Sequence, residues 1–168
     1  VVPHITDEIK RRIEVAAEDA DLLIGEIGGT VGDIESLPFI ESIRQFAHDV
    51  GPQNVLFIHL VLVPYLAAAG ELKTKPAQHS VKAMQSLGLF PEVILCRSDR
   101  DIEESALDKL SMFCNVPRGN VFQAKDVNSI YKVPLEFYKQ RLDERVIEVL
   151  GIWASRPNIK NLEEVVYN

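Results

Sequence analysis

The sequence predicts an α/β fold with a mostly parallel sheet and helices on both of its faces. Short apolar runs, rich in β-branched residues, alternate along the chain with segments of helical periodicity. Strands that alternate with helices pair in parallel through right-handed crossovers, and these crossovers place helices on both faces of the sheet. With 168 residues and 46% hydrophobic content, the chain suits a single domain or part of one.

The helices are predicted from amphipathic periodicity and from their start and stop signals. The first begins at Thr6, the expected N-cap, because acidic residues follow it and apolar residues recur at helical spacing. Gly51 and Gly88 are expected to end two further helices. The predicted helical ranges are 6–20, 37–50, 76–89, 103–114 and 142–150.

Four apolar runs are predicted to form the strands of the sheet, at 21–27, 54–65, 92–97 and 120–127. The run at 54–65 lacks polar alternation, as expected of a strand that is covered on both faces. The sequence contains no internal repeat, low-complexity stretch or evident linker. We therefore expect one domain over 1–150, with 151–168 forming the end of that domain or the start of a linker.

Charge, hydropathy and cysteine content narrow the class of function. The net charge of −7 and the pI near 5.1 disfavour nucleic acid or an anionic membrane as the main partner, and favour a small-molecule ligand. No signal segment is visible, and no apolar run approaches the length of a membrane span. Cys96 and Cys114 lack the spacing of a zinc site and are predicted to be reduced structural thiols of a cytosolic protein.

A glycine-rich acidic loop, "GEIGGTVGDIE" at 25–35, follows the first predicted strand. Glu26 stands at the end of that strand, where an unpaired buried carboxylate would be costly. It needs a cation, which is either an Arg or Lys side chain or a Mg²⁺ ion, and the pattern does not separate the two. Because glycines allow close approach of the backbone to a ligand, the grouping of Asp33 and Glu35 with them predicts a binding site.

A second candidate site is the loop "GELKTKPAQ", which supplies Lys73, Thr74, Lys75 and Gln78 just before a predicted helix. Cationic side chains at a helix N-terminus are typical of a triphosphate or anion receptor, although an ordinary solvated loop is the alternative. Charged residues also follow the last two strands, at Arg97 and at 125–127. If these strand ends share one edge of the sheet, as in open α/β folds, they form a nucleotide site together with Glu26.

The histidines point to no catalytic centre. His59 lies within an apolar strand and is predicted to be a hydrogen-bonded core residue, whereas His48 and His79 are predicted to lie on helix surfaces. No Ser-His-Asp or Cys-His arrangement is legible, so no catalytic residue is assigned.

Several motifs together resemble the CTP synthases. They are "VVPHIT", "GGTVGDIES", "KTKP", "LCRSDR", "FCNVP" and "KDVNSIYKVPL", and they run in one order from Val1 to at least Leu135. The resemblance implies the N-terminal amidoligase domain of that family, a P-loop, dethiobiotin-synthetase-like fold, without its first part. It also implies ATP-dependent amination of UTP at C4 through a 4-phosphorylated intermediate, with ammonia taken from glutamine.

The resemblance also implies the residues of the sites and the partners. Mg²⁺ is the cofactor, with Glu26 as a ligand, and ATP, UTP and the feedback inhibitor CTP are the nucleotides. A glutaminase domain in the same parent chain, a homotetramer with nucleotide sites at subunit contacts, and a cytoplasmic location are expected. UTP and CTP contacts are expected from Asp33, Ile34, Glu35, Lys73, Thr74, Lys75, Pro76, Ala77, Gln78 and Lys109, ATP contacts from Arg97, Lys125, Asp126 and Val127, and weaker CTP or nucleotide contacts from Glu41, Arg44 and His4.

The sequence departs from the family pattern in three respects. The phosphate loop and its lysines belong to a region before Val1, the glutaminase cysteine belongs to a region after Asn168, and Ala77 replaces a common threonine. We therefore expect this chain to be a portion of a synthase domain that is catalytically inactive on its own. One alternative is a naturally truncated subunit that binds nucleotides or assists assembly. Another is a different amidoligase with the same fold, which the motifs "KTKPAQ" and "SIYKVP" argue against.

Overall fold

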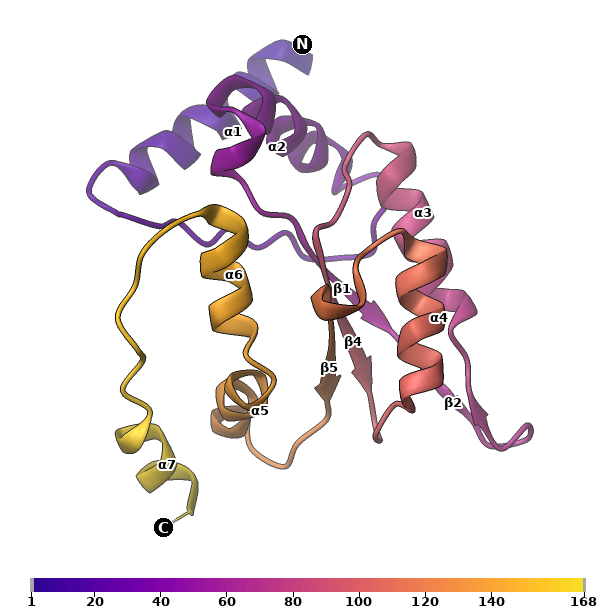
Figure 1. Cartoon of the computed structure of the whole chain (residues 1–168). Coiled ribbons are helices and arrows are strands. Elements are labelled where there is room, and N and C mark those ends of the chain that lie inside the picture. Colours follow the sequence, from indigo (N-terminus) through magenta and orange to yellow (C-terminus); the bar gives the residue numbers. More distant parts are fainter. Residues whose placement is uncertain (1, 168) are drawn as a thin grey trace.

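The computed structural model describes residues 2–167, so Val1 and Asn168, which bound the expected first and last segments, lie outside it. Its centre is a parallel sheet of three strands in the order β1-β4-β5. These strands are β1 (Ile58–Leu62), β4 (Val93–Ser98) and β5 (Val121–Lys125). Figure 1 shows α3 and α4 on one side of this sheet, with α5 and α6 on the other. The predicted α/β class is confirmed.

The main core lies between the sheet and the helices α3 (Lys75–Ser86) and α4 (Glu104–Cys114). Ile94 and Cys96 of β4 are fully buried there, against Val81 of α3 and Leu110 of α4. A strand contributes every second residue to this core, and a helix contributes the residues of one face. Amphipathic strands and helices form a layered core in this way. The predicted strands at 92–97 and 120–127 and the predicted helices around them are confirmed.

Two further helices lie over the end of the sheet at which the strands begin (Figure 1). They are α1 (Val2–Ala17) and α2 (Leu37–Val50), and a salt bridge of 3.0 Å joins Lys10 to Asp49 between them. The prediction that Thr6 caps the first helix is wrong. The helix starts earlier, and the buried Thr6 hydroxyl donates to the carbonyls of Val2 and Pro3 within it.

The strand predicted at 21–27 is absent from the described part of the chain. These residues have no strand assignment, and the side chain of Ile24 is 86% exposed. An apolar run becomes a strand only where a neighbouring strand pairs with its backbone and a second layer covers its side chains. Neither is supplied to 21–27 by the described residues.

The long strand predicted at 54–65 is also wrong in length and in environment. After the short helix η1 (Pro52–Asn54), β1 covers five residues with alternating burial. Its inward side chains, His59 and Val61, are buried, whereas Leu60 on the opposite face is 56% exposed. β1 is therefore covered on one face within residues 2–167, not on two.

A small antiparallel hairpin follows β1. This hairpin was not predicted from the sequence. It pairs β2 (Tyr65–Leu66) with β3 (Glu71–Leu72), and Figure 1 shows it projecting beyond the rest of the sheet. Gly70 at φ +65° completes its turn, a left-handed conformation that suits glycine.

The C-terminal part of the described chain is helical apart from 152–159, which form no regular element. After η2 (Arg118–Asn120), β5 and η3 (Ile130–Lys132), α5 (Val133–Lys139) and α6 (Leu142–Leu150) pack beside β5, and α7 (Lys160–Tyr167) follows. The predicted helix at 142–150 is confirmed as α6. Among the described residues, every helix is too short or too polar to cross a bilayer.

Candidate functional site

The carboxyl ends of the three strands meet at one edge of the sheet, as predicted for a ligand site. The backbone N–H of Val63, just after β1, donates to the carbonyl of Arg97 at 2.8 Å. The N–H of Asp126, just after β5, donates to the carbonyl of Ser98 at 2.8 Å. These bonds continue the ladder beyond the strands, so the charged segments that follow β1, β4 and β5 lie side by side.

The N-terminus of α3 opens at this same edge. The N–H of Lys73 donates to the carbonyl of Pro64 at 2.8 Å, which holds the start of α3 against the end of β1. Thr74 occupies the N-cap position, and the Lys75 side chain is exposed beside it. The free N–H groups of the first turn and the two lysines make a positive site of the kind that binds phosphate.

Burial divides the predicted triphosphate residues into two groups. Lys73, Lys75 and Pro76 are exposed or partly exposed, so they can reach a ligand. Thr74 and Gln78 are buried and bonded to each other, with the Gln78 amide donating to the Thr74 hydroxyl at 3.1 Å. Ala77 is fully buried in the core, so its side chain faces away from any ligand and only its backbone is available.

Lys109 of α4 approaches the same group of charges. Lys73 forms a salt bridge with Glu71 of the hairpin, and the Lys73 ammonium, followed by the more distant Lys109, lowers the pKa of the Glu71 carboxyl. The Lys109 side chain is exposed on α4. Glu71, which the sequence analysis did not single out, is thus paired with Lys73, one of the cations predicted to bind the triphosphate.

The residues predicted on the ATP side also form ion pairs at this edge. Arg97 Nε donates to Asp126 Oδ1 at 2.9 Å, and Lys125 Nζ donates to Asp101 Oδ2 at 2.8 Å. Val127 follows directly and is partly buried. The structure thus brings the four predicted residues together, across the ends of β4 and β5.

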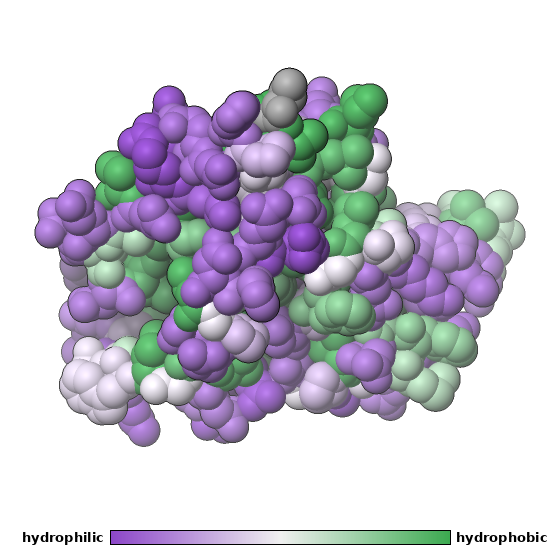
Figure 2. All heavy atoms as spheres, turned by 90° about the horizontal axis from the view of Figure 1, so that it is seen from above, coloured by the Kyte–Doolittle hydropathy of each residue, from purple (hydrophilic) through white to green (hydrophobic). Residues whose placement is uncertain are grey.

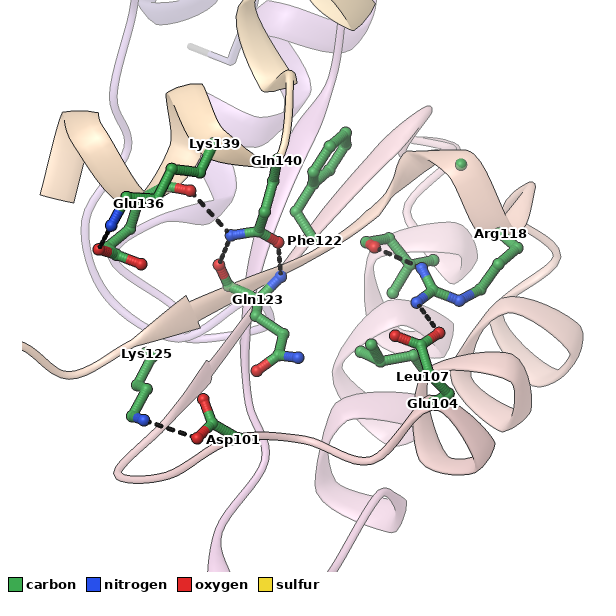
Figure 3. A pocket seen from close by; sticks show the side chains of 12 residues that line it. Asp101, Glu104, Leu107, Arg118, Phe122, Gln123, Lys125, Glu136, Lys139 and Gln140 are labelled. Atoms are coloured by element: carbon green, nitrogen blue, oxygen red, sulfur yellow. Dashed lines mark hydrogen bonds and ion pairs between the residues drawn. The ribbon is translucent and has the colours of Figure 1, made fainter.

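A cavity of about 430 Å³ lies beside Lys125, between β5, α4 and α5 (Figure 3). On one wall the Gln140 side chain binds both backbone groups of Gln123, and on the other Arg118 is bonded to Glu104 and to the Val121 carbonyl. Arg118, Lys125 and Lys139 are each paired with a carboxylate, so the positive charges that line the cavity are balanced by negative ones.

The glycine loop lies at the opposite edge of the sheet, which contradicts the prediction that all strand ends converge. Ile27 and Val31 pack against Met84 and Leu89, at the C-terminal end of α3, and near Phe57 before β1. α3 has 12 residues, of which Lys75 is the first, and this corresponds to a helix length of about 18 Å at 1.5 Å per residue. The loop was misplaced because 21–27 was assumed to be a strand that ends at the ligand edge.

Within this loop, the residues predicted to contact UTP form an exposed turn. The carbonyl of Asp33 accepts from both the N–H and the hydroxyl of Ser36, at 3.1 and 2.8 Å. The side chains of Asp33, Ile34 and Glu35 are exposed, and Ile34 is 86% exposed. They face away from the described core and are free to contact a ligand or another chain.

The weaker candidates lie near the N-terminal helices. Arg44 and Glu41 form a two-bond ion pair, with Arg44 Nη2 at 2.8 Å from Glu41 Oε1. The Arg44 guanidinium, and then Gln45, lowers the pKa of Glu41 to about 2. Arg44 also lies against Gly88, where an added Cβ would stand 3.0 Å from its Cδ. His4 is exposed on α1.

His59, His48 and His79 occupy the environments predicted for them. His59 is buried, with its Nε2 at 2.8 Å from the Ser80 hydroxyl of α3, and burial lowers its pKa. His48 and His79 are exposed on helices. Cys96 and Cys114 are free and buried, and burial raises their thiol pKa values to about 12 and about 11, as expected of inert structural thiols.

Comparison with known proteins identifies the family. The family described as CTP synthase N-terminus matches residues 1–152. The chain belongs to the CTP synthase family. It is 51% identical over 166 residues to a CTP synthase of Syntrophus aciditrophicus, and 52% identical over 167 residues to one of Koribacter versatilis. Each match covers 99% of this chain but only 31% and 30% of the relative, so the chain spans about a third of a CTP synthase.

Membership of the CTP synthase family makes Mg²⁺ the expected ion, and Glu26 fits it only as a single ligand. The Glu26 side chain is exposed, so the prediction that it is buried and therefore needs a cation is wrong. Residues 2–167 hold no group of three acidic, histidine or cysteine side chains that could bind a metal. Because Mg²⁺ often takes one or two carboxylates and completes its shell with phosphates and water, Glu26 remains chemically suitable as one contributor.

Proposed function

We propose that this chain forms the UTP-binding part of a CTP synthase that aminates UTP at C4 at the expense of ATP. The γ-phosphoryl group of ATP is transferred to O4 of UTP, which leaves ADP. Ammonia from glutamine then attacks C4 and releases inorganic phosphate, which gives CTP. The protein is expected to act in the cytoplasm as a homotetramer, with a glutaminase domain in the same parent chain and Mg²⁺ bound with the nucleotides.

The positive start of α3 supports the assignment of the triphosphate. Lys73 and Lys75 come from the loop at the start of α3 and Lys109 comes from α4, so two segments supply lysines on this side of the sheet. The N–H groups of the first turn of α3 add a dipole that favours anions. CTP has the same triphosphate, so it competes for this point as a feedback inhibitor, with Glu41 and Arg44 as weaker candidates for its base.

The ATP side is assigned to the neighbouring strand ends. Arg97 and Asp126 are paired across β4 and β5, and Lys125 and Val127 flank them. This group lies at the same edge as the start of α3, so the two nucleotides would bind side by side, as the transfer of a phosphoryl group between them requires.

The observation that carries the proposal of a shared site is the separation of its two halves. The glycine loop that carries residues 33–35 packs through Ile27 and Val31 at the C-terminal end of α3, whereas the lysines lie at its N-terminal end. We therefore infer that one UTP molecule does not bridge both ends of α3 within one copy, and that the loop of one copy completes the site of another. Exposed apolar side chains beside the loop, such as Ile24, Ile34 and Phe39, suit burial in such a subunit contact. Figure 2 shows hydrophobic surface among hydrophilic surface on the face seen from above.

The first test is the Lys75→Ala variant of the protein expressed from its complete coding sequence. We expect loss of CTP formation even when free ammonia is supplied, because the triphosphate loses a cation at the helix terminus. Lys82→Ala is the matched control, since Lys82 is exposed on the same helix but two turns further along. Normal turnover by the Lys75→Ala variant would refute the assignment of the triphosphate site.

The second test separates a shared site from one built within a single copy. Lys75→Ala and Glu35→Ala variants are assayed alone and after mixing under conditions that exchange subunits. In a twofold contact, random mixing restores about one quarter of the sites, because half of the pairs are mixed and each mixed pair holds one intact site. No recovery on mixing would refute the shared site.

A further inference from the structure

The motif "LCRSDR" contains a pair, Asp99 and Arg100, to which the proposed function gives no role. The Arg100 guanidinium lies over the ring of Tyr65, with its Cζ 3.3 Å from the ring centroid. Asp99 holds the guanidinium from the side through two bonds of 2.9 Å, from Nε and from Nη2. Arg100, in the loop after β4, thus contacts Tyr65, the first residue of the hairpin that follows β1.

The hairpin needs such an anchor. Its ladder has only two residue pairs, Tyr65 with Leu72 and Leu66 with Glu71, and two-stranded hairpins are marginal in water without further packing. Its tip, 66–71, is exposed throughout. Tyr65 and Leu72 at its base are partly buried, and Leu72 packs against the main core.

The hairpin carries the residues that lead into the start of α3. Tyr65 pairs with Leu72, Leu72 precedes Lys73, and Glu71 forms the salt bridge with Lys73. The position of Tyr65 therefore affects the position of Lys73, because Tyr65 pairs with Leu72 and Leu72 directly precedes Lys73. A guanidinium on an aromatic face supplies a directional contact that remains effective at a partly exposed site.

We propose that Arg100, held by Asp99 and stacked on Tyr65, is a positioning residue that fixes the hairpin and with it Lys73 at the UTP site. The alternative role for Arg100 is direct contact with a nucleotide phosphate. The two roles differ in what they require of Tyr65, because a direct contact would not depend on its ring. The assignment of UTP rests on the proposed function, whereas the clamp itself rests on the contacts of Arg100.

The first experiment uses the protein expressed from its complete coding sequence, with Tyr65→Leu, Tyr65→Phe, Arg100→Met and the double variant Tyr65→Leu/Arg100→Met. We expect Tyr65→Leu and Arg100→Met each to raise KM for UTP about two- to five-fold, the range that a partly exposed cation–π contact supports. The KM for ATP and kcat should change little. Tyr65→Phe keeps the ring and should restore normal KM, and the double variant should be no worse than either single one.

The control is Arg12→Met, since Arg12 is exposed on α1 and, among residues 2–167, is bonded only to Glu8. Independent effects that multiply in the double variant would overturn the clamp. So would equal effects of Tyr65→Phe and Tyr65→Leu, or a large effect of Arg100→Met with none from Tyr65→Leu, which would make Arg100 a direct ligand.

A second measurement tests the clamp without any nucleotide. Amide hydrogen exchange over 65–73 should accelerate about two- to five-fold in Tyr65→Leu and in Arg100→Met, and not in Tyr65→Phe or Arg12→Met. Faster exchange without a change in KM for UTP would overturn the UTP assignment while keeping the clamp. Unchanged exchange in both variants would overturn the clamp itself.

Discussion

Gln140 offers the sharpest test of how the sheet ends at β5. Its side-chain Oε1 accepts from the N–H of Gln123 at 2.8 Å, and its Nε2 donates to the carbonyl of Gln123 at 2.9 Å. The amide thus takes the place of a further strand on the outer edge of β5 (Figure 3). An uncapped edge exposes unpaired backbone groups, which is the usual route to unwanted strand pairing.

The Gln140→Ala substitution removes both bonds and leaves the backbone of Gln123 unpaired on that side. Two net hydrogen bonds of about 0.5–1.5 kcal/mol each give a local loss of about 1–3 kcal/mol. The amide of Gln123 should therefore exchange about 5- to 150-fold faster with solvent deuterium. Hydrogen exchange resolved over 121–125, in the protein expressed from its complete coding sequence, measures this directly.

The matched control is Gln53→Ala, because Gln53 is exposed in η1 and far along the chain from β5. Unchanged exchange of Gln123 in the Gln140→Ala variant would refute the reasoning, since the strand edge would then be protected by something other than this side chain. An equal acceleration in the Gln53→Ala control would refute it too, because the effect would be global.

Two further predictions concern stability. Leu110→Ala should lower the free energy of unfolding by about 2–5 kcal/mol, because Leu110 is fully buried between α4 and the sheet, and a thermal-unfolding series against exposed Met112→Ala measures the difference. Burial lowers the pKa of His59 from 6.5, so the unfolded chain binds a proton more readily, and stability should fall as pH drops below about 6.5. His59→Gln should remove that part of the pH dependence, and an identical pH profile in the variant would contradict it.

The sequence predicted the parts of the fold that local pattern determines. The strand at 92–97 and the helices around it are continuous apolar or amphipathic runs with clear ends, and their pattern and their burial agree. The hairpin at 65–72 was missed because its strands are only two residues long, which is too short for any periodicity to appear.

The errors at 21–27 and at β1 share one physical cause. An apolar segment is expected to be buried, but its composition does not show which helix or strand buries it. Nor does its composition show whether that helix or strand lies nearby in the sequence. The prediction that Glu26 is buried failed for the same reason, since it assumed that 21–27 forms a buried strand. The lysines at the start of α3 were placed correctly because a helix N-terminus after a strand has only one edge of the sheet to occupy.

The placement of the two half-sites at opposite ends of α3 has a consequence for symmetry. Under the proposed assembly, a twofold axis that brings the 33–35 turn of one copy to Lys75 of a second must bring the reciprocal pair together as well. Sites would then appear and vanish in pairs, and the number of working sites would follow the population of dimers, not that of chains. Activity per milligram of enzyme should therefore fall on dilution toward the dissociation constant, even with every nucleotide saturating.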